Sequence, residues 1–182
     1  MNPTEVYVRR LLALGDGERA ELRHKQGASL SESLEGFDLF TGLWWPLRQR
    51  SPAAPQRETS WLAAKLICQW PIPLASSDDS VLPRLLGSAE RRLSARYALR
   101  FLLRFDRLLQ SPMALLEPQL QWALKVVAQA VVAGSAKGLN WVQLLDDLAV
   151  WDGRPGRESK HNVRDAWARA YLASRNREGK RC

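Results

Sequence analysis

Residues 88–110, SAERRLSARYALRFLLRFDRLLQ, place basic and apolar side chains at every third or fourth position. This spacing is the period of an α-helix, in which each residue turns by about 100°. One arc of the predicted helix is therefore basic and the opposite arc is apolar. The basic arc holds Arg92, Arg96, Arg100, Arg104 and Arg107, and the apolar arc holds Tyr97, Phe101, Leu102, Phe105, Leu108 and Leu109. Ser88 can cap the N-terminus, so we expect one long amphipathic helix with an all-Arg outer face.

Helical periodicity continues on both sides of this stretch, and no alternating run of β-branched residues interrupts it. Pro46 is expected to kink one of these helices or end it early, and PIPLASSDDS, residues 71–80, is expected to be a loop. The sequence therefore predicts an all-α fold of two packed helical sub-bundles, residues 1–87 and residues 88–182. The predicted helices cover about residues 3–14, 17–25, 37–50, 59–70, 88–110, 115–133, 140–151 and 163–175.

The composition is that of an ordinary globular protein, because 46% of the 182 residues are hydrophobic and 25% are charged. Two cysteines, Cys68 and Cys182, do not make a disulfide framework. No apolar leader opens the chain, and no apolar stretch approaches the roughly 20 residues that span a bilayer. We therefore expect a cytoplasmic protein that has no contact with membranes.

Positive charge is concentrated in two segments of a chain whose net charge is +8. Residues 88–110 carry six Arg against two acids, and residues 154–182 carry nine basic side chains against three acids. An uncompensated row of Arg repels itself, so its presence favours binding of a polyanion over a merely solvated face. Arg outnumbers Lys 21 to 6, which suits phosphate oxygens but is equally explained by a GC-rich genome.

Sequence motifs of catalysis and metal binding are absent, including the phosphate loop, G-x-G-x-x-G, C-x-x-C and H-E-x-x-H. His24 and His161 lie far apart beside basic residues, which favours surface or phosphate-contacting roles over metal ligation. Asp146 and Asp147 are the best candidates for a two-metal nuclease pair. Adjacent helix residues point about 100° apart, however, so a solvated or salt-bridged face is favoured. We predict no catalytic residue, no metal site and no cofactor, with a nuclease as an alternative.

Two aromatic features have a structural and a functional interpretation. Trp44-Trp45 could stack bases of a single strand, but we favour Trp44 packing inward and Trp45 lining the interface between the sub-bundles. The last two predicted helices carry apolar stripes that should form one cluster. Its members are Trp141, Leu144, Leu148, Trp151, Trp167 and Tyr171.

Five segments together resemble one known family over nearly the whole chain. They are GDGERAELRHKQGASL at 15–30, FDLFTGLWWPL at 37–47, LPRLLGSAERRLSARYALRFLLRFDRLL at 82–109, LNWVQLLDDLAVW at 139–151 and VRDAWARAYL at 163–172. The last two are the most telling, as a W-x-x-L-L-x-D-L-x-x-W helix followed by a V-R-x-x-W-A-R-x-Y helix. In combination and order, these segments resemble the CasB family, the small subunit of the type I-E CRISPR-associated Cascade complex.

This resemblance implies an all-helical subunit without enzymatic activity, which assembles as a dimer inside an RNA-guided antiviral surveillance complex. Its partners would be guide RNA and target DNA, contacted through their backbones, together with the large subunit and the backbone subunits of Cascade. Sequence recognition would be left to the guide, and the small subunit would help to hold the displaced strand of the R-loop. The alternative is a free-standing helical DNA-binding regulator, for which no base-reading helix start is found.

The candidate nucleic-acid-binding residues come partly from the basic segments and partly from the resemblance. Arg23, Arg91 and Arg92 match basic positions of the family, and Arg96, Arg100, Arg104 and Arg107 continue the basic face. The basic loop before the last helix adds Arg154, Arg157 and Lys160. Arg164 and Arg169 match the final motif but are equally placed to pair with Asp146, Asp147 or Asp165.

Overall fold

A computed structural model of the chain describes residues 2–30, 37–152 and 162–177. These residues form nine α-helices and two short 3-10 helices, and their one strand-like pairing is an isolated bridge between Leu74 and Leu139. The all-α prediction is confirmed. The helices are α1 (Pro3–Leu12), α2 (Asp16–Arg23), α3 (Phe37–Arg50), α4 (Arg57–Gln69), η1 (Asp78–Ser80), α5 (Leu82–Glu90), α6 (Ala95–Gln110), η2 (Met113–Leu115), α7 (Glu117–Val132), α8 (Trp141–Leu148) and α9 (Val163–Arg175).

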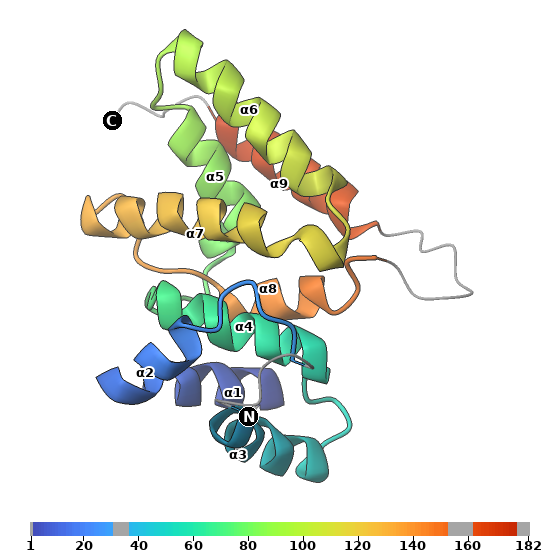
Figure 1. Cartoon of the computed structure of the whole chain (residues 1–182). Helices are drawn as coiled ribbons and strands as arrows, with labels where there is room; N and C mark the ends of the chain where they lie inside the picture. The colour runs from blue at the N-terminus through green and yellow to red at the C-terminus, as the bar shows by residue number, and fades with distance from the viewer. Residues whose placement is uncertain (1, 31–36, 153–161, 178–182) are drawn as a thin grey trace.

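The helices are arranged along one long direction of the molecule. Helices α1 to α4 lie at one end, α5, α6 and α9 lie at the other, and α7 and α8 cross between them (Figure 1). Helix α8 packs against α1 and α4, while α7 packs against α4, α5 and α6. Buried apolar side chains from both ends belong to one continuous core. Residue 87 lies inside α5, and the division into two sub-bundles stays a prediction.

The predicted helix over residues 88–110 is wrong in its first part. Helix α5 ends at Glu90, the chain turns, and α6 begins at Ala95 with Ser94 as its N-cap residue. Helix α5 packs closely against α9 before this turn, since a Cβ on Gly87 would lie 2.3 Å from the Tyr171 carbonyl oxygen. The Ser88 hydroxyl faces α9 as well, 2.8 Å from that of Ser174, and caps no helix.

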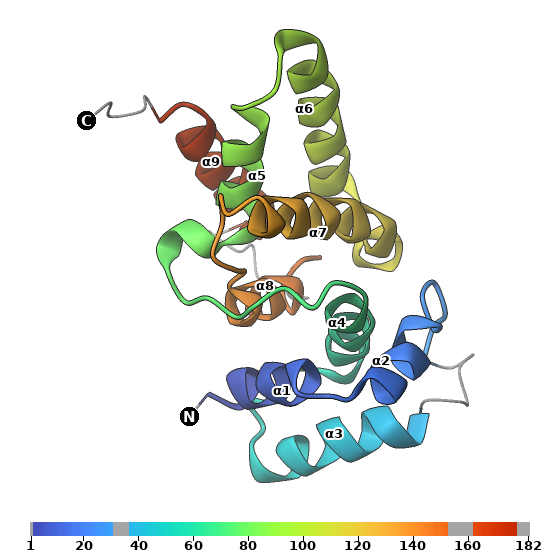
Figure 2. The ribbon, with the colours of Figure 1, turned by 90° about the vertical axis from the view of Figure 1, so that its left-hand side faces the viewer.

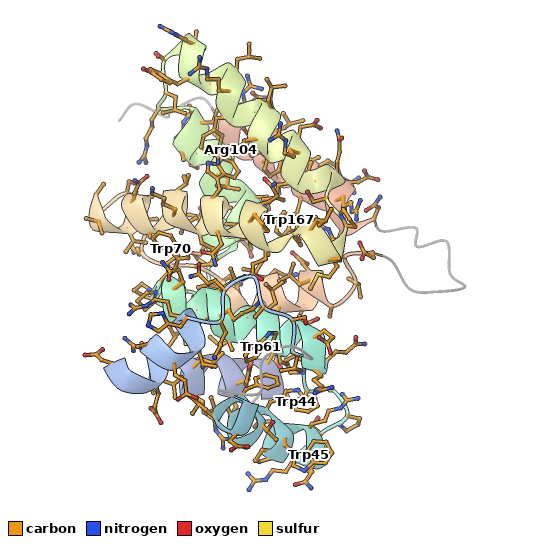
Figure 3. The ribbon with its side chains drawn as sticks, in the orientation of Figure 1. Trp44, Trp45, Trp61, Trp70, Arg104 and Trp167 are labelled. Atoms are coloured by element: carbon orange, nitrogen blue, oxygen red, sulfur yellow. The ribbon has the colours of Figure 1, made fainter. Side chains whose placement is uncertain are left out.

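The end of the molecule at α3 differs from the prediction in two ways. Pro46 lies inside α3, which continues to Arg50, so Pro46 does not end the helix. Trp44 packs inward as expected, and its indole Nε1 donates to the Pro55 carbonyl oxygen at 2.9 Å. Trp45 is 48% exposed at the outer end of the molecule (Figure 3). It therefore lines no interface between sub-bundles.

The predicted aromatic cluster of the last two helices is confirmed. All six of its side chains are at most 3% exposed. The rings of Trp151 and Trp167 meet edge to face with centroids 4.9 Å apart, and Tyr171 stacks on Phe105 of α6 at 3.9 Å. The cluster thus anchors α6 as well as joining α8 to α9. No helix among the described residues has both the length and the apolar character needed to cross a membrane.

Candidate nucleic-acid interface

Helix α6 carries the candidate interface at the edge of the molecule. Its buried residues are Phe101, Phe105 and Leu108, which fix one face of the helix to the protein. Its N-terminal end extends beyond α5 and α9, and its outer side is not covered by another helix (Figure 2). An amphipathic helix held along one face in this way presents the opposite face to solvent.

Three Arg side chains form the open part of this face. Arg96, Arg100 and Arg107 are exposed and lie within a narrow arc at roughly 100° per residue. No acidic side chain pairs with any of them in the part of the chain that the structure describes. Asp106 of the same helix accepts instead from the Gln110 amide at 2.6 Å. Their charges are therefore available to an external anion.

Arg104 is also exposed, but it has a second contact. Its guanidinium carbon lies 5.3 Å from the centroid of the Trp122 ring of α7, and Phe101 meets the same ring edge to face at 5.0 Å. Figure 3 shows Arg104 between α6 and α7. A guanidinium over an aromatic face is stabilised by cation–π attraction. Arg104 therefore helps to pack α6 on α7 and is a poorer candidate for a purely external contact.

The apolar arc of α6 is narrower than the sequence predicts. Tyr97 was expected inside and is 57% exposed, and Leu99 and Leu103 are 60% and 61% exposed. Tyr97 lies in the first turn of α6, at the end of the helix that extends beyond α5 and α9 (Figure 2). At roughly 100° per residue, Leu99 and Leu103 lie on the side of α6 opposite to the buried Phe101 and Phe105. The Arg face is consequently flanked by exposed apolar side chains.

The remaining predicted site residues are dispersed. Arg23 ends α2 at the opposite end of the molecule from α6 (Figure 1). Arg91 and Arg92 lie in the turn between α5 and α6 and are not part of the Arg face, so the predicted arc loses Arg92. Arg154, Arg157 and Lys160 lie outside the described residues. Arg164 pairs with Asp152 at 3.0 Å and not with Asp146, Asp147 or Asp165, the acids that the sequence offered as alternative partners.

A basic hollow of about 540 Å³ adjoins Arg91 and Arg92. Three of its charged residues, Asp79, Lys137 and Arg177, were not predicted from the sequence as site residues. Asp79 Oδ1 accepts from Arg177 at 2.8 Å and from Arg84 at 3.3 Å, and these contacts lower the pKa of Asp79. The basic C-terminal segment was the one sequence signal for Arg177, and none pointed to Asp79.

The acidic pair on α8 is the expected solvated face only in part, because Asp146 is exposed whereas Asp147 is half-buried. Asp147 Oδ2 accepts from the Trp167 indole at 2.6 Å, and its Oδ1 accepts from Gln143 at 2.8 Å. Burial raises the pKa of both carboxyls, and the charge of Asp147 raises that of Asp146 further. Within residues 2–30, 37–152 and 162–177, no three His, Cys, Asp or Glu side chains gather closely enough to hold a metal ion. Asp147 thus serves as the hydrogen-bond acceptor that ties α9 to α8.

Asp147→Asn is expected to leave the free energy of unfolding unchanged or raised at neutral pH. Because the folded-state pKa of Asp147 is raised, its ionised form opposes folding above that pKa, and the penalty disappears as pH falls through it. Asn keeps an acceptor for Trp167 without the charge, so its advantage should shrink on acidification. Urea denaturation across pH measures this effect.

Asp165→Asn, which removes an exposed carboxylate from the first turn of α9, is the matched control and should give no such gain. An Asp147→Asn variant that is less stable than the wild type at neutral pH, by more than in acid, would contradict the prediction.

The family model of CRISPR-associated protein Cse2 matches residues 18–172. The chain belongs to the Cse2 family. Membership implies association with a CRISPR Cascade complex, and it agrees with the resemblance derived from the helical motifs. No curated protein sequence matches the chain.

Solved structures of this family share the fold of the chain. The crystal structure of M. ruber CasB has a TM-score of 0.66 at 20% identity, over 94% of this chain and 93% of that one. A CRISPR-associated protein of the Cse2 family from Thermus thermophilus has a TM-score of 0.64 at 20% identity, over 95% of this chain and 99% of that one. At this identity, the likeness extends to the fold.

Proposed function

We propose that this Cse2-family chain is the non-catalytic small subunit of a type I-E Cascade complex. In this role it binds the backbones of guide RNA and target DNA and stabilises the displaced strand of the R-loop without reading its sequence. The observation that carries the proposal is the row of Arg96, Arg100 and Arg107, exposed on the open face of α6 without acidic partners among the described residues.

The chemistry of this row suits phosphodiesters. A guanidinium offers several donors in a planar fork that matches phosphate oxygens. Contacts to phosphate position a nucleic acid but carry no sequence information, so such a face would bind any strand that guide pairing displaces. Binding would release counterions and would weaken steeply as salt rises.

Assembly is part of the same proposal. The large subunit, the backbone subunits and a second copy of this chain are the proposed protein partners in a cytoplasmic complex. Leu99 and Leu103 support this, because exposed apolar side chains beside a charged face are typical of surfaces that meet a partner. The family membership supports it independently.

Changing Arg96, Arg100 and Arg107 together to Ala should weaken binding to single-stranded DNA and RNA of any sequence. Three lost phosphate contacts should reduce the slope of log affinity against log salt by about two units. Stability should hold or rise slightly, because Ala is the best helix former and self-repulsion is relieved. Fluorescence anisotropy over a salt series, with thermal melting of each variant, measures both effects.

The single change Arg100→Ala should weaken binding in the same direction, and Arg50→Ala is its matched control because it removes an exposed Arg from α3 at the far end of the molecule. It should change affinity much less. Equal losses from both variants would show that net charge alone drives binding, and the α6 face would not be the site. Strong preference for one sequence would favour the regulator, and metal-dependent cleavage by the isolated chain would favour the nuclease.

A further inference from the structure

The basic hollow beside the turn that precedes α6 is built from four separate segments. Its walls come from the η1 segment, from α5 and the turn that follows it, from the turn between α7 and α8, and from the residue at the end of the last described segment. The charged side chains that line it are Asp79, Arg91, Arg92, Lys137 and Arg177. Among the described residues, four cations and one carboxylate thus line the hollow, and its excess of positive charge attracts anions.

The hydroxyl groups of the hollow have partners within the protein. Ser77 and Ser80 contact each other through their hydroxyls at 2.6 Å, and Ser135 donates to the Ala130 carbonyl oxygen at 3.0 Å. The Ser88 hydroxyl is bonded to Ser174, as described above. The strongest donors for an anionic ligand are the cationic side chains, of which Arg91 also donates to the Arg177 carbonyl oxygen at 2.7 Å. A ligand with delocalised negative charge on several oxygens, such as a phosphodiester, matches this set.

The Asp79 carboxylate is already bound by cationic side chains at the hollow, as an anionic ligand would be. Its Oδ1 accepts from two guanidinium groups, those of Arg177 and Arg84. The side chains of Asp79 and Arg177 are 68% and 58% exposed, so the pair is open to solvent. Exposed ion pairs contribute little net free energy and exchange readily for another anion. Asp79 is thus a removable carboxylate that stands where a phosphate oxygen would bind.

We propose that the hollow is a second phosphate-binding site in which Asp79 competes with the phosphodiester for Arg177 and Arg84. This inference rests on the proposed binding of nucleic-acid backbones. The turn holding Arg91 and Arg92 leads directly into α6, so a strand bound in the hollow continues onto the Arg face. In the free chain Asp79 holds the two guanidinium groups, and an entering phosphate displaces it.

Asp79→Asn tests the competition. Removing the carboxylate frees both guanidinium groups, so affinity for a mixed-sequence single-stranded DNA oligonucleotide should rise roughly two- to fivefold at low salt. The slope of log affinity against log salt should steepen by about 0.7 for each phosphate newly neutralised. RNA of the same sequence should respond alike, because both strands present the same phosphodiester.

Asp78→Asn is the matched control. It makes the same change in net charge at the neighbouring exposed residue, which does not line the hollow. Equal gains from the two variants would overturn the proposal, because the effect would then be one of overall charge. A response of DNA or RNA alone would also overturn it.

A double-mutant cycle identifies the groups for which Asp79 competes. In an Arg177→Ala background, Asp79→Asn should lose much of its gain, because one of the two released cations is missing. Lys137→Ala should weaken binding, whereas Lys125→Ala, on the exposed part of α7 outside the hollow, should weaken it less. Additive effects in the cycle would contradict the proposal.

The test separates this inference from the proposed function. One outcome is that the triple Arg variant of α6 weakens binding while Asp79→Asn and Lys137→Ala behave as their controls do. That result would support the α6 interface and contradict the phosphate site in the hollow. Absence of salt-dependent binding by the wild-type chain would contradict both the proposed function and the phosphate site in the hollow. Thermal melting of each variant establishes that it is folded under the assay conditions.

Discussion

We expect Trp151→Ala to lower the free energy of unfolding by about 3–5 kcal/mol, which is the cost of truncating an aromatic side chain in a protein core. Trp151 is 3% exposed, packs edge to face on Trp167, and donates its indole Nε1 to the Ser111 carbonyl oxygen at 2.8 Å. Arg164 lies over the same ring, with its guanidinium carbon 5.3 Å from the ring centroid. Truncation therefore leaves a large cavity where η2, α8 and α9 meet, and the partly buried Ser111 carbonyl loses its donor.

Trp45→Ala is the control, because the same atoms are removed from a side chain that is 48% exposed. Little buried surface is lost there, so the cost should stay within about 1 kcal/mol. Chemical denaturation of the two variants, followed by far-UV circular dichroism, measures the difference. A Trp151→Ala protein that unfolds at the same denaturant concentration as Trp45→Ala would show that this junction contributes nothing to stability.

Glu117→Gln is expected to cost about 3–5 kcal/mol, because it leaves a buried charge without its partner. The Lys65 side chain is 4% exposed, and its ammonium group lies 2.6 Å from Glu117 Oε2. The same ammonium donates to the Ala28 carbonyl oxygen at 3.0 Å, and Glu117 Oε1 accepts from the Gly27 amide. The pair thus joins α4, α7 and the segment after α2 at one buried point.

Glu5→Gln provides the matched comparison. Glu5 pairs with Arg9 at 2.7 Å within α1, where the Arg side chain is 60% exposed. Loss of such an exposed pair should cost at most about 1 kcal/mol. Adding Lys65→Met to Glu117→Gln should recover much of the loss, since no charge then remains buried. If Glu117→Gln and Glu5→Gln unfold at the same denaturant concentration, water reaches Lys65 and the pair is not effectively buried.

Features that depend on neighbours along the chain were predictable from the sequence. Helical spacing alone indicated the all-α class. The starts of α8 and α9 are local in the same way, because the side chains of Asn140 and Asn162 each accept from an amide two or three residues ahead. The burial of the cluster from Trp141 to Tyr171 was also predicted correctly, since the apolar face of an amphipathic helix packs against the protein core. The order of these motifs further indicated the family.

The candidate site was predictable in part, and the limit is visible on α6. Arg100 and Arg104 occupy equivalent positions in the sequence pattern, but Arg104 alone lies over Trp122 because α7 passes beneath it. Tyr97 shares the apolar arc of Phe101 and is nevertheless exposed, since α6 extends past its neighbours there. Periodicity states which residues share a face, but not which part of that face another helix covers.

The start of α6 and the basic hollow depend on contacts between residues distant in sequence. Ser88 and Ser94 are both acceptable N-cap residues by local chemistry. Ser88 lies inside α5 with its hydroxyl against that of Ser174 in α9, and Ser94 occupies the N-cap position of α6. In the hollow, Asp79 meets an Arg 98 positions further along the chain. Local sequence patterns follow from backbone geometry within a few residues. Long-range pairs such as these arise when whole helices pack, and that packing sets where the exposed cations gather.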